Sequence, residues 1–395
     1  MRIAMITTHP PSKGSLNEYG FHLVRNLLLK PESVSELVLL TDELPEGQSY
    51  SIGQEPGPVP VRVQTCWKFG AWNNALRIRK AVREINPDIV FFNIQFASFG
   101  DKKIPGALGL LTPWLVRKSG FKTVVLLHNI METVNLKSAG FGGNPLIESI
   151  IRLSGNVITR FLLTANRVAV TIPKYVEILE STYGAKNVIL APHGSFDEPT
   201  NTQPNTMPGG VPNIMTFGKF GTYKKVEILL EAFESLLPDH PGAKLVIAGT
   251  DSPNMKGYLD GVKAQYAHVP NVHFTGYVSE EDLPLIFGAA WVVVFPYTST
   301  TGSSGVLHQA GGYGKAVVLP NLGDLAELVL EEGYDGEFFE PTDAASLADA
   351  IRRVIDFPER QLEIGSRNFM ASNGLPISDV VDWYLIHFDE LLKGR

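Results

Sequence analysis

One stretch in the last third of the chain places a strand, a loop, a helix and a second strand in close succession. Residues 291–295 are a continuous apolar run with three valines, which is typical of a fully buried parallel strand. The next segment, residues 298–305, contains only Thr, Ser and Gly. We predict a short helix that ends near Gly314 and a buried strand from Lys315 to Leu319. This order is typical of the β-α-β unit of a parallel sheet.

The loop at residues 298–305 has the composition of a phosphate-binding turn. Small residues before a helix leave backbone N–H groups open, so an anion can approach them closely. An ordinary strand-to-helix connection with a Ser or Thr N-cap has the same composition. The loop alone therefore leaves both interpretations open.

Length and composition limit the class of protein. A chain of 395 residues with 44% hydrophobic and 19% charged residues is typical of a globular protein with two domains of ordinary size. The single cysteine, Cys66, excludes an intramolecular disulfide and suggests a reducing compartment. The apolar start of the chain stops at Thr7, and no later run has the length of a membrane span. We expect a cytoplasmic protein.

Charge differs between the two halves of the chain. Residues 1–200 contain 21 Lys+Arg and 16 Asp+Glu, a net charge of +5, whereas residues 201–395 contain 13 and 25, a net charge of −12. This asymmetry supports two separately composed domains. The basic half suits either peripheral contact with the inner face of an anionic membrane or a plain solvated surface. No basic tract is interleaved with aromatic residues, so we expect no nucleic-acid partner.

Strand and helix patterns alternate through the first half. Helices are predicted at residues 17–29 and 71–85. Strands are predicted at residues 2–8, 37–40, 59–63, 88–93, 123–129, 167–172 and 188–191. This alternation predicts a parallel sheet with helices on both faces.

The same alternation begins again after a Pro-, Thr- and Asn-rich linker at residues 195–212. Strands are predicted at residues 214–218, 244–249, 272–276, 291–295, 315–319 and 336–339. Helices are predicted at residues 226–236, from 280 onward, at 324–331 and at 377–392. We therefore predict an α/β protein with two tandem Rossmann-like, doubly wound domains that face a cleft. The domains are residues 1–194 and 213–376, and residues 377–395 form a final helix.

One apolar segment interrupts the first domain. Residues 104–116 are mostly apolar and are flanked by Lys102, Lys103, Arg117 and Lys118. Such a segment either lies on a membrane surface or is a core helix whose charged ends extend to water. The core helix is the favoured interpretation.

The strand at residues 123–129 delivers His128 to its carboxyl end, where ligands bind in open α/β sheets. Glu132 follows four residues later and is a second candidate for the same cleft. A lone histidine is more often a hydrogen-bonded structural residue, so the functional and structural interpretations have similar weight.

Together these residues resemble the retaining GT-B glycosyltransferases, and in particular family 4. Gly218-Lys219 with Lys224 resembles the diphosphate-binding element of that family, and Leu127-His128-Asn129 resembles its strand-end histidine. Residues 271–283 are close to the family's sequence before its base-binding turn. Pro192-His193-Gly194 is similar to its Pro-Asn-Gly exit from the first domain. The final helix resembles the one that crosses back onto the N-terminal domain.

The resemblance implies a set of site residues. His128, Lys219 and Lys224 would act in catalysis, and Asn129 and Glu132 would bind the acceptor. Gly14-Ser15 stands where the family has a paired-glycine loop. Donor-binding positions would be Gly14, Ser15, Gly218, Gly249, Tyr277, Val278, Thr301, Gly302, Ser303, Ser304, Gly305 and Gln309.

The family usually has two glutamates eight positions apart in the segment that opens this section. Alignment on Ala310 and Gly314 puts Thr301 and Gln309 at those positions, so both carboxylates are replaced. The Gln309 amide can still bond a ribose hydroxyl, whereas Thr301 can bond a sugar hydroxyl only singly. This leaves the donor's identity open and allows for a catalytically reduced protein.

The resemblance implies transfer of a hexose from a UDP- or GDP-linked sugar to a glycan, lipid-linked or small-molecule acceptor, with retention of configuration. We expect no metal and no cofactor, because Lys219 and Lys224 can neutralise the departing diphosphate. Two alternatives remain open. One is a nucleotide-sugar epimerase on the same fold, and the other is a binding or scaffold protein that has lost catalysis.

Overall fold

The structure is a computed structural model that describes residues 1–50, 57–133, 145–196, 209–252, 255–299 and 304–394. The described residues divide into two compact units. The N-terminal unit contains residues up to His193 together with residues 377–394, and the C-terminal unit contains residues 194–376. The final helix is therefore part of the N-terminal unit.

The N-terminal unit is built on a seven-stranded sheet in the order β3-β2-β1-β4-β5-β6-β7. All neighbouring strands run parallel. Their bounds are β1 Arg2–Ile6, β2 Glu36–Asp42, β3 Val61–Trp67, β4 Ile89–Ile94, β5 Lys122–Leu127, β6 Arg167–Val170 and β7 Val188–Leu190. Strand order reverses between β1 and β4, and ligands of such sheets bind beyond the carboxyl ends of the strands at this point.

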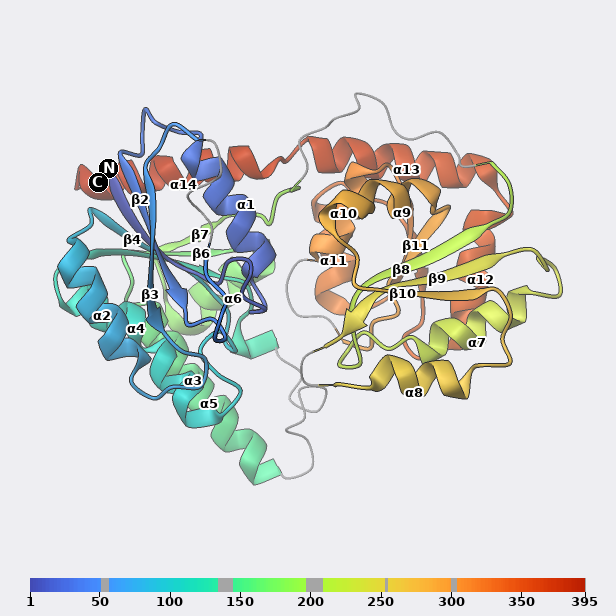
Figure 1. The fold of residues 1–395 in the computed structure, drawn as a ribbon, viewed down its shortest axis with the longest axis horizontal. Helices are drawn as coiled ribbons and strands as arrows, with labels where there is room; N and C mark the ends of the chain where they lie inside the picture. The colour runs from blue at the N-terminus through green and yellow to red at the C-terminus, as the bar shows by residue number, and fades with distance from the viewer. Residues whose placement is uncertain (51–56, 134–144, 197–208, 253–254, 300–303, 395) are drawn as a thin grey trace. The chain divides into compact units, whose positions relative to one another are not determined.

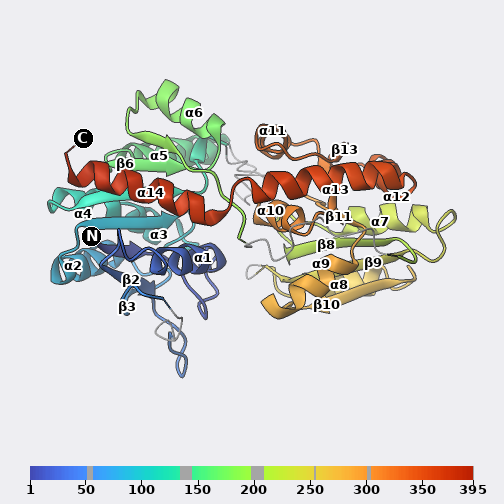
Figure 2. The same ribbon diagram turned by 90° about the horizontal axis from the view of Figure 1, so that it is seen from above.

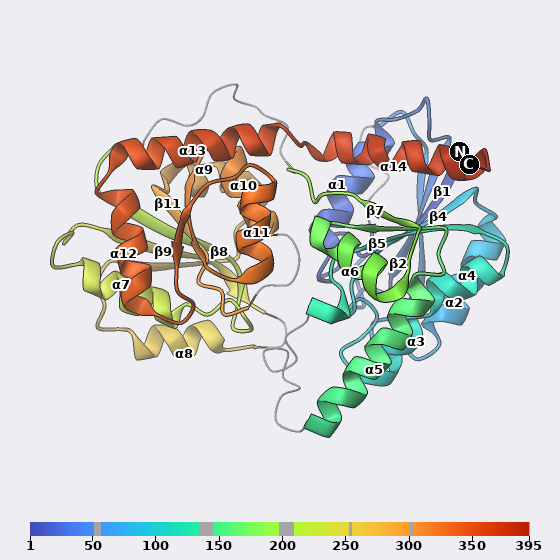
Figure 3. The same ribbon diagram turned by 180° about the vertical axis from the view of Figure 1, so that it is seen from behind.

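The helices of this unit form two groups (Figure 1). Their bounds are α1 Asn17–Leu28, α2 Asn74–Ile85, α3 Lys103–Leu110, α4 Thr112–Lys118, α5 Pro145–Leu162, α6 Pro173–Tyr183 and α14 Ile377–Leu392, with a 3-10 turn, η1, at Met131–Thr133. Helix α14 packs beside α1, as Figure 2 also shows, and its Tyr384 and Phe388 contact Phe91 of β4. Helix α3 contacts α2, α4 and α5, and α4 also contacts α2 and α5; Figure 3 shows these helices from behind.

The C-terminal unit is built on a six-stranded parallel sheet in the order β10-β9-β8-β11-β12-β13. The strands are β8 Asn213–Phe220, β9 Lys244–Asp251, β10 Val272–Gly276, β11 Val292–Val294, β12 Ala316–Pro320 and β13 Glu337–Phe339. Here the order reverses between β8 and β11. The same argument places a ligand site at the carboxyl ends of these two strands.

Two hydrophobic cores cover the two faces of this sheet. Residues of α7 and α12 pack on one face, and residues of α9, α10 and α11 pack on the other (Figure 1). The helices are α7 Glu227–Leu236, α8 Tyr258–Gln265, α9 Leu283–Ala289, α10 Gly305–Gly312, α11 Gly323–Glu331, α12 Ala344–Ile355 and α13 Pro358–Asn373, with a 3-10 turn, η3, at Glu280–Asp282. Alternate residues of β8 therefore face different helices, which fixes the direction of each side chain near the site.

The predicted α/β fold with two Rossmann-like sheets is confirmed, but several element bounds differ from the prediction. Strand β3 runs to Trp67 rather than ending at Val63, and β8 runs to Phe220, so Gly218 and Lys219 lie inside the strand. Helices α5, α6, α8, α12 and α13 lie where no helix was predicted. Much of the predicted linker, residues 197–208, lies outside the described residues.

The apolar segment at residues 102–118 is two helices rather than one. Helix α4 buries Thr112, Pro113 and Val116, as expected for a core helix. Helix α3 buries Gly106, Gly109 and Leu110 but leaves Ile104 and Leu108 exposed. Among the described residues, no helix combines the length and the apolar character needed to cross a membrane.

Candidate active site

Two glycines face each other at the carboxyl end of β8 in the C-terminal unit. Gly218 of β8 is in register with Gly249 of β9. A Cβ atom on Gly249 would lie 1.9 Å from the Gly218 carbonyl oxygen, and Gly249 has a φ of 133°. Any larger residue at position 249 would therefore separate the two strands or strain the backbone. The pair keeps this end of the sheet open at backbone level.

The ammonium group of Lys224 lies against Gly218 of this pair. A Cβ atom on Gly218 would lie 2.8 Å from Lys224 Nζ, so the missing side chain leaves the space that the ammonium group uses. Lys224 Nζ also lies 4.8 Å from the centroid of the Tyr297 ring. An aromatic face attracts a cation at this distance. Glycine and tyrosine together hold a positive charge at the carboxyl edge of the sheet.

Backbone contacts join the loop that carries Lys224 to the segment after β11. Residues 224 and 297 form an antiparallel bridge, and the Lys225 amide donates to the Pro296 carbonyl at 3.2 Å. The Thr298 amide donates to the Tyr223 carbonyl at 2.8 Å. Strands β8 and β11 are the two strands of the reversal, so these bonds connect the two sides of the predicted ligand site.

Helix α10 begins close to the same residues. Ser304 is its N-cap residue. Among the described residues, the Ser304 side chain makes no capping hydrogen bond to the helix. The first amides of a helix have no partner within the helix and carry a partial positive charge. The buried Tyr297 hydroxyl has no hydrogen-bond partner among the described residues, and Ser304 is near enough to influence its pKa. Lys224 and the start of α10 are therefore both close to Tyr297, and each contributes positive potential there.

Lys219 lies inside β8, and strand alternation places it on the face of Met215 and Phe217. That face is the one that α9, α10 and α11 cover. The Lys219 side chain is exposed. The structure therefore puts Lys219 near the carboxyl edge of the sheet, at the end of the strand that precedes the Lys224 loop.

The remaining predicted donor-binding residues are only partly described. Gln309 is buried in α10, and Tyr277 and Val278 follow β10 at the carboxyl edge of the same sheet, with Tyr277 largely exposed. Gly305 is the first residue of α10. Thr301, Gly302 and Ser303 lie outside the described residues.

In the N-terminal unit, His128 is held by a chain of hydrogen bonds at the reversal between β1 and β4. The Thr7 hydroxyl donates to the Thr8 carbonyl at 2.8 Å, so Thr7 Oγ1 accepts from Asn93 Nδ2 at 2.9 Å. Asn93 Oδ1 is then the acceptor for His128 Nε2, at 2.7 Å. This order assigns the imidazole proton to Nε2 and leaves a lone pair on Nδ1.

Burial keeps this imidazole neutral. Burial, with a smaller contribution from the nearby His193, lowers the pKa of His128 to about 3. The Tyr19 ring packs against both histidines, with centroid distances of 4.7 Å to His128 and 4.5 Å to His193. At neutral pH His128 is therefore a weak base that can accept a hydrogen bond through Nδ1.

The predicted paired-glycine loop lies at the same edge of the N-terminal sheet. A Cβ atom on Gly14 would lie 2.3 Å from Thr8 Cγ2, so only glycine fits this close approach. Ser15 Oγ accepts a hydrogen bond from Gln95 Nε2 at 2.5 Å, and Gln95 follows β4. Gly14 and Ser15 therefore lie at the ends of β1 and β4, as His128 and Asn93 do.

The two predicted acceptor-binding residues have partners inside the unit. Asn129 Oδ1 accepts from the Phe96 amide at 3.1 Å. Glu132 Oε1 accepts from the Tyr183 hydroxyl of α6, while Glu132 Oε2 is buried without a hydrogen-bond partner among the described residues. One carboxylate oxygen of Glu132 is therefore enclosed by the protein without a hydrogen-bond partner among the described residues.

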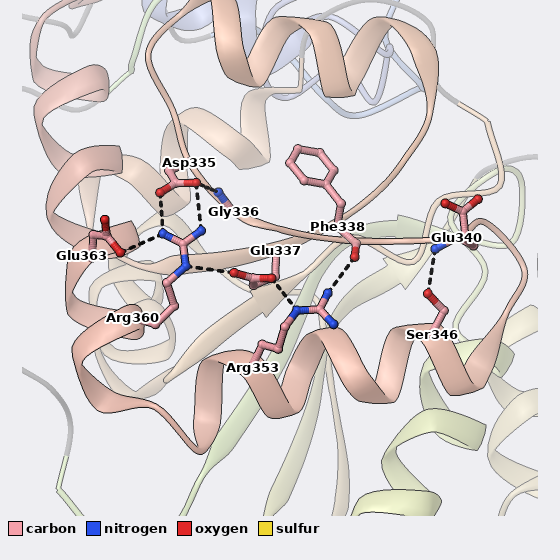
Figure 4. Close-up of polar contacts among 9 residues, drawn as sticks. All are labelled: Asp335, Gly336, Glu337, Phe338, Glu340, Ser346, Arg353, Arg360 and Glu363. Carbon is pink, nitrogen blue, oxygen red and sulfur yellow. Dashed lines mark hydrogen bonds and ion pairs between the residues drawn. The ribbon is translucent and has the colours of Figure 1, made fainter.

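A separate cluster of charges lies at the far edge of the C-terminal sheet (Figure 4). Arg360 bonds to Asp335, Glu337 and Glu363, and Arg353 bonds to Glu337 and to the Phe338 carbonyl. Because these carboxylates are all paired with arginine, the cluster attaches edge strand β13 to α12 and α13. We assign it a structural role.

Within the described ranges, no group of three His, Cys, Asp or Glu residues could hold a metal ion. The positive charge at the candidate site comes from Lys224, Lys219 and the start of α10.

Two residues of the site were missed by sequence reasoning. Asn93 ends a strand beside the one that delivers His128, and polar residues at neighbouring strand ends are a usable signal. Tyr297 gave no such signal, because its contact with Lys224 joins residues 73 positions apart (297 − 224). Only the fold brings this ring beneath the ammonium group.

Comparison with known proteins gives a family match for the region that contains the donor-side residues. Residues 211–356 match the family "Glycosyl transferases group 1". An uncharacterised glycosyltransferase of Methanocaldococcus jannaschii is 30% identical over 161 residues, which are 40% of this chain and 38% of that protein. The chain spans less than two thirds of the length of the first curated relatives that it matches.

Solved structures resemble the whole chain. Sucrose-phosphate synthase from Thermosynechococcus elongatus gives a TM-score of 0.75 at 18% identity, with 100% of both chains covered. An Anabaena protein solved in complex with UDP-glucose gives a TM-score of 0.68 at 16% identity, again with 100% of both chains covered. At these identities the likeness establishes the GT-B fold with its two Rossmann-like sheets.

Proposed function

We propose that this protein is a retaining glycosyltransferase that takes a hexose from a UDP- or GDP-linked sugar. The observation that carries the proposal is the placement of the Lys224 ammonium group against Gly218, beside Tyr297 and near the start of α10. These residues lie in the region that matches the group 1 glycosyl transferases. They also lie where a parallel sheet reverses its strand order, which is the expected place for a nucleotide.

The proposed chemistry follows from where charge develops. As the bond from the sugar to the diphosphate breaks, negative charge grows on the leaving phosphate oxygen, and fixed positive groups there lower the barrier. Lys224, Lys219 and the first amides of α10 supply these groups. We assign Ser304 and Gly305, together with Thr301, Gly302 and Ser303, to the loop that binds the phosphates. No metal ion or cofactor enters this scheme.

We propose that His128 orients a hydroxyl group of the sugar or acceptor through Nδ1. A histidine whose pKa is about 3 is a poor proton acceptor at neutral pH, so it is not the general base. The departing phosphate oxygen would take the acceptor proton instead. Asn129 and Glu132 are the proposed contacts with the acceptor, which would be a glycan, a lipid-linked glycan or a small molecule.

We propose that Thr301 and Gln309 replace the two glutamates that family-4 enzymes use for the sugar and the ribose. Gln309 would bond a ribose hydroxyl through its amide, and Gly14, Ser15, Tyr277 and Val278 would complete the donor site. Loss of both carboxylates also supports a second candidate, a nucleotide-sugar-binding protein with reduced catalysis. The free, buried Cys66 is compatible with a cytoplasmic location.

A thermal-shift panel of nucleotide sugars tests the proposal directly. A ligand that binds only the native state raises the unfolding midpoint, so the donor should stand out among UDP- and GDP-linked sugars. Slow hydrolysis of that donor without an acceptor would support the transferase. Binding without hydrolysis, or with no transfer to any acceptor tried, would support the binding protein. Formation of an isomerised nucleotide sugar would instead identify an epimerase.

Lysine variants test the assigned roles. Lys219→Ala and Lys224→Ala should weaken binding of a nucleoside diphosphate by about tenfold or more, because each removes a charge-assisted contact. Both variants should bind the bare nucleoside as the wild type does, and Lys244→Ala, which removes an exposed lysine at the opposite, amino end of β9, is the matched control. Equal weakening for nucleoside and nucleoside diphosphate would refute the phosphate-binding role.

A further inference from the structure

Three neighbouring segments of the N-terminal unit expose large apolar side chains. They are residues 68–76 before and within α2, helix α3, and the middle of α5, and we call them the lipid face. Trp72 is 70% exposed, Ile104 is 72% exposed and Leu153 is 66% exposed. Phe69 and Leu76 are also exposed. Isolated exposed apolar residues are normal, but a group of this size is a sign of an interaction surface.

The three segments are joined by direct contacts. The Gly70 amide donates to the Phe99 carbonyl at 2.8 Å, and a Cβ atom on Gly100 would lie 3.2 Å from Gly70 Cα. The loop before α2 therefore packs on the loop before α3. Helix α3 in turn contacts both α2 and α5, and Figure 3 shows the three helices together. The exposed side chains thus come from one continuous part of the unit.

Each of the two helices leaves one stripe unburied. Ile104 and Leu108 are four residues apart on α3, and Leu153 and Val157 are four residues apart on α5, so each pair lies on one side of its helix. The opposite side of α5 packs inward, because a Cβ atom on Gly155 would lie 2.2 Å from Met131 Cγ. The apolar stripes are therefore additional to the residues that each helix needs for its own packing.

Positive charge surrounds these stripes. Lys68, Lys102, Lys103 and Arg152 are exposed on or directly beside the same three segments, where Asp101 is an exposed acid. Residues 68–118 contain nine Lys+Arg and three Asp+Glu, a net charge of +6, in a chain whose net charge is −7. Within this range Arg77 pairs with Glu43 and Lys80 with Glu84, so the charge beside the exposed apolar side chains comes from Lys68, Lys102 and Lys103, together with Arg152 of α5.

We infer that the lipid face binds the surface of an anionic bilayer. Tryptophan and leucine side chains enter the headgroup region of such a surface, while lysines beside them contact lipid phosphates. Lysine is depleted in protein–protein interfaces, which makes a protein partner a poorer fit. A second copy fits poorly as well, because symmetric pairing of this face would bring like charges together. The inference is independent of the proposed enzymatic activity.

Vesicle binding of the full-length protein tests this inference. We expect sedimentation with phosphatidylcholine vesicles that contain phosphatidylglycerol, weaker binding at high salt, and little binding to pure phosphatidylcholine. The double variant Trp72→Ser/Ile104→Ser should bind at least about tenfold more weakly, because two apolar side chains no longer enter the interface. Lys102→Ala/Lys103→Ala should also lose about tenfold and show a smaller salt dependence.

Matched controls come from the C-terminal unit. Leu285→Ser removes a side chain that is 75% exposed, and Lys244→Ala/Lys256→Ala removes two exposed lysines. These variants should bind vesicles as the wild type does. All the substituted residues are exposed, so unchanged unfolding midpoints verify the fold.

Tryptophan fluorescence provides a second readout, because Trp72 is the most exposed of the five tryptophans. Anionic vesicles should shift the emission to the blue in the wild type and in Trp383→Phe but not in Trp72→Phe. Equal vesicle binding by wild type and Trp72→Ser/Ile104→Ser would overturn the inference. Self-association in the absence of vesicles, abolished by the same substitutions, would overturn it in favour of a contact between copies.

Discussion

Lys224 shows how single residues prepare the candidate donor site. Its ammonium group occupies space that Gly218 leaves empty and rests on the Tyr297 ring. Lysine ordinarily loses much side-chain entropy when it binds a ligand. A ring and a glycine that already restrict the side chain reduce this cost. Contacts within the protein therefore partly order the Lys224 side chain.

Substitution of Tyr297 tests this arrangement. Tyr297→Leu removes the aromatic face, and the loss of a cation–π contact of about 1 kcal/mol should weaken nucleoside diphosphate binding roughly fivefold. Tyr297→Phe keeps the face and should bind as the wild type does. Isothermal titration calorimetry with the nucleoside diphosphate and with the bare nucleoside measures whether the loss of affinity is specific to the diphosphate. A loss that is the same for the nucleoside would point to a general disturbance of the site.

The pKa of His128 should depend on the residue at position 93, because Asn93 Oδ1 is hydrogen-bonded to His128 Nε2. In the wild type, burial holds the pKa of His128 at about 3, below the ordinary value of 6.5. Asn93→Asp places a carboxylate beside Nε2, which should raise this pKa toward neutrality. Side-chain NMR titration measures the change directly. Asn129→Asp adds a carboxylate at a residue bonded to the Phe96 amide rather than to His128, so it should leave the pKa of His128 much closer to the wild-type value.

The sign of the linked stability change follows from the same pKa values. Because the folded pKa of His128 is lower than the unfolded value, the unfolded state binds more protons below about pH 6.5, and stability falls as pH decreases through that range. Asn93→Asp should reduce this acid sensitivity. Unchanged acid sensitivity together with an unchanged pKa of His128 would contradict the assigned hydrogen bond.

At the scale of elements, α10 rests on a buried polar group that sits behind the candidate site. His308 of α10 contacts the Tyr334 hydroxyl through Nδ1 at 2.8 Å, and its Nε2 lies 3.6 Å from Glu332 Oε2 after α11. Burial, with a smaller contribution from the neighbouring Glu331, raises the pKa of Glu332 to about 8. Glu332 therefore stays protonated in the folded protein under mildly acidic conditions. A carboxyl group that resists ionisation therefore lies close to His308 of α10.

Glu332→Gln should remove a pH dependence of stability in the C-terminal unit. The folded carboxyl group keeps its proton from about pH 4.5 to about pH 8 while the unfolded one loses it, so wild-type stability falls as pH rises through this window. One pKa unit corresponds to about 1.4 kcal/mol, so the fall should amount to several kcal/mol. Urea unfolding across the window measures it. Glu331→Gln changes an exposed neighbour and should keep much of the dependence of the unfolding free energy on pH. A wild-type stability that rises with pH through this window would contradict the prediction.

At the scale of the whole molecule, the C-terminal helix α14 is part of the N-terminal unit. Helix α14 packs beside α1 and places Tyr384 and Phe388 against Phe91 of β4. Trp383 Nε1 donates to the Leu190 carbonyl, and Lys30 pairs with Asp382 at the surface. The N-terminal sheet therefore has a complete hydrophobic face only after the last residues have been added.

Phe388→Ala should destabilise the N-terminal unit selectively. Phe388 is fully buried, and truncation of such a side chain costs about 3–5 kcal/mol. Calorimetry with and without a nucleoside diphosphate should show one transition that falls in the variant and another, raised by the nucleotide, that does not. Ile386→Ala on the exposed side of the same helix is the control. An equal fall of both transitions would show that the two units unfold together.

Most of the fold was predictable because parallel strands buried on both faces appear in the sequence as continuous apolar runs. Such a run can be recognised without knowing which strands lie beside it. Strands β4, β5 and β12 were found in this way, and so were helices with one apolar side such as α1 and α14. Helices α12 and α13 were missed although they complete the C-terminal unit. The buried apolar residues of α12 recur at helical spacing (Leu347, Ala348, Ile351, Val354 and Ile355), so its pattern was present in the sequence and was overlooked. Helix α13 buries Gln361, Asn368 and Ser372 beside its apolar residues, so it shows no continuous apolar stripe.

For this protein, the order of residues by itself determined which short segments are strands, where the two sheets repeat, and which glycines and lysines come to the strand ends. These properties are local, since they depend on side-chain volume, backbone freedom and spacing along the chain. The tertiary structure alone decided that Tyr297 lies under Lys224, that Asn93 fixes the proton of His128, and that residues 68–76 join α3 and α5 in one exposed face. Each of these depends on contacts between segments far apart in the chain, and those contacts form only when the strands take their order in the sheet.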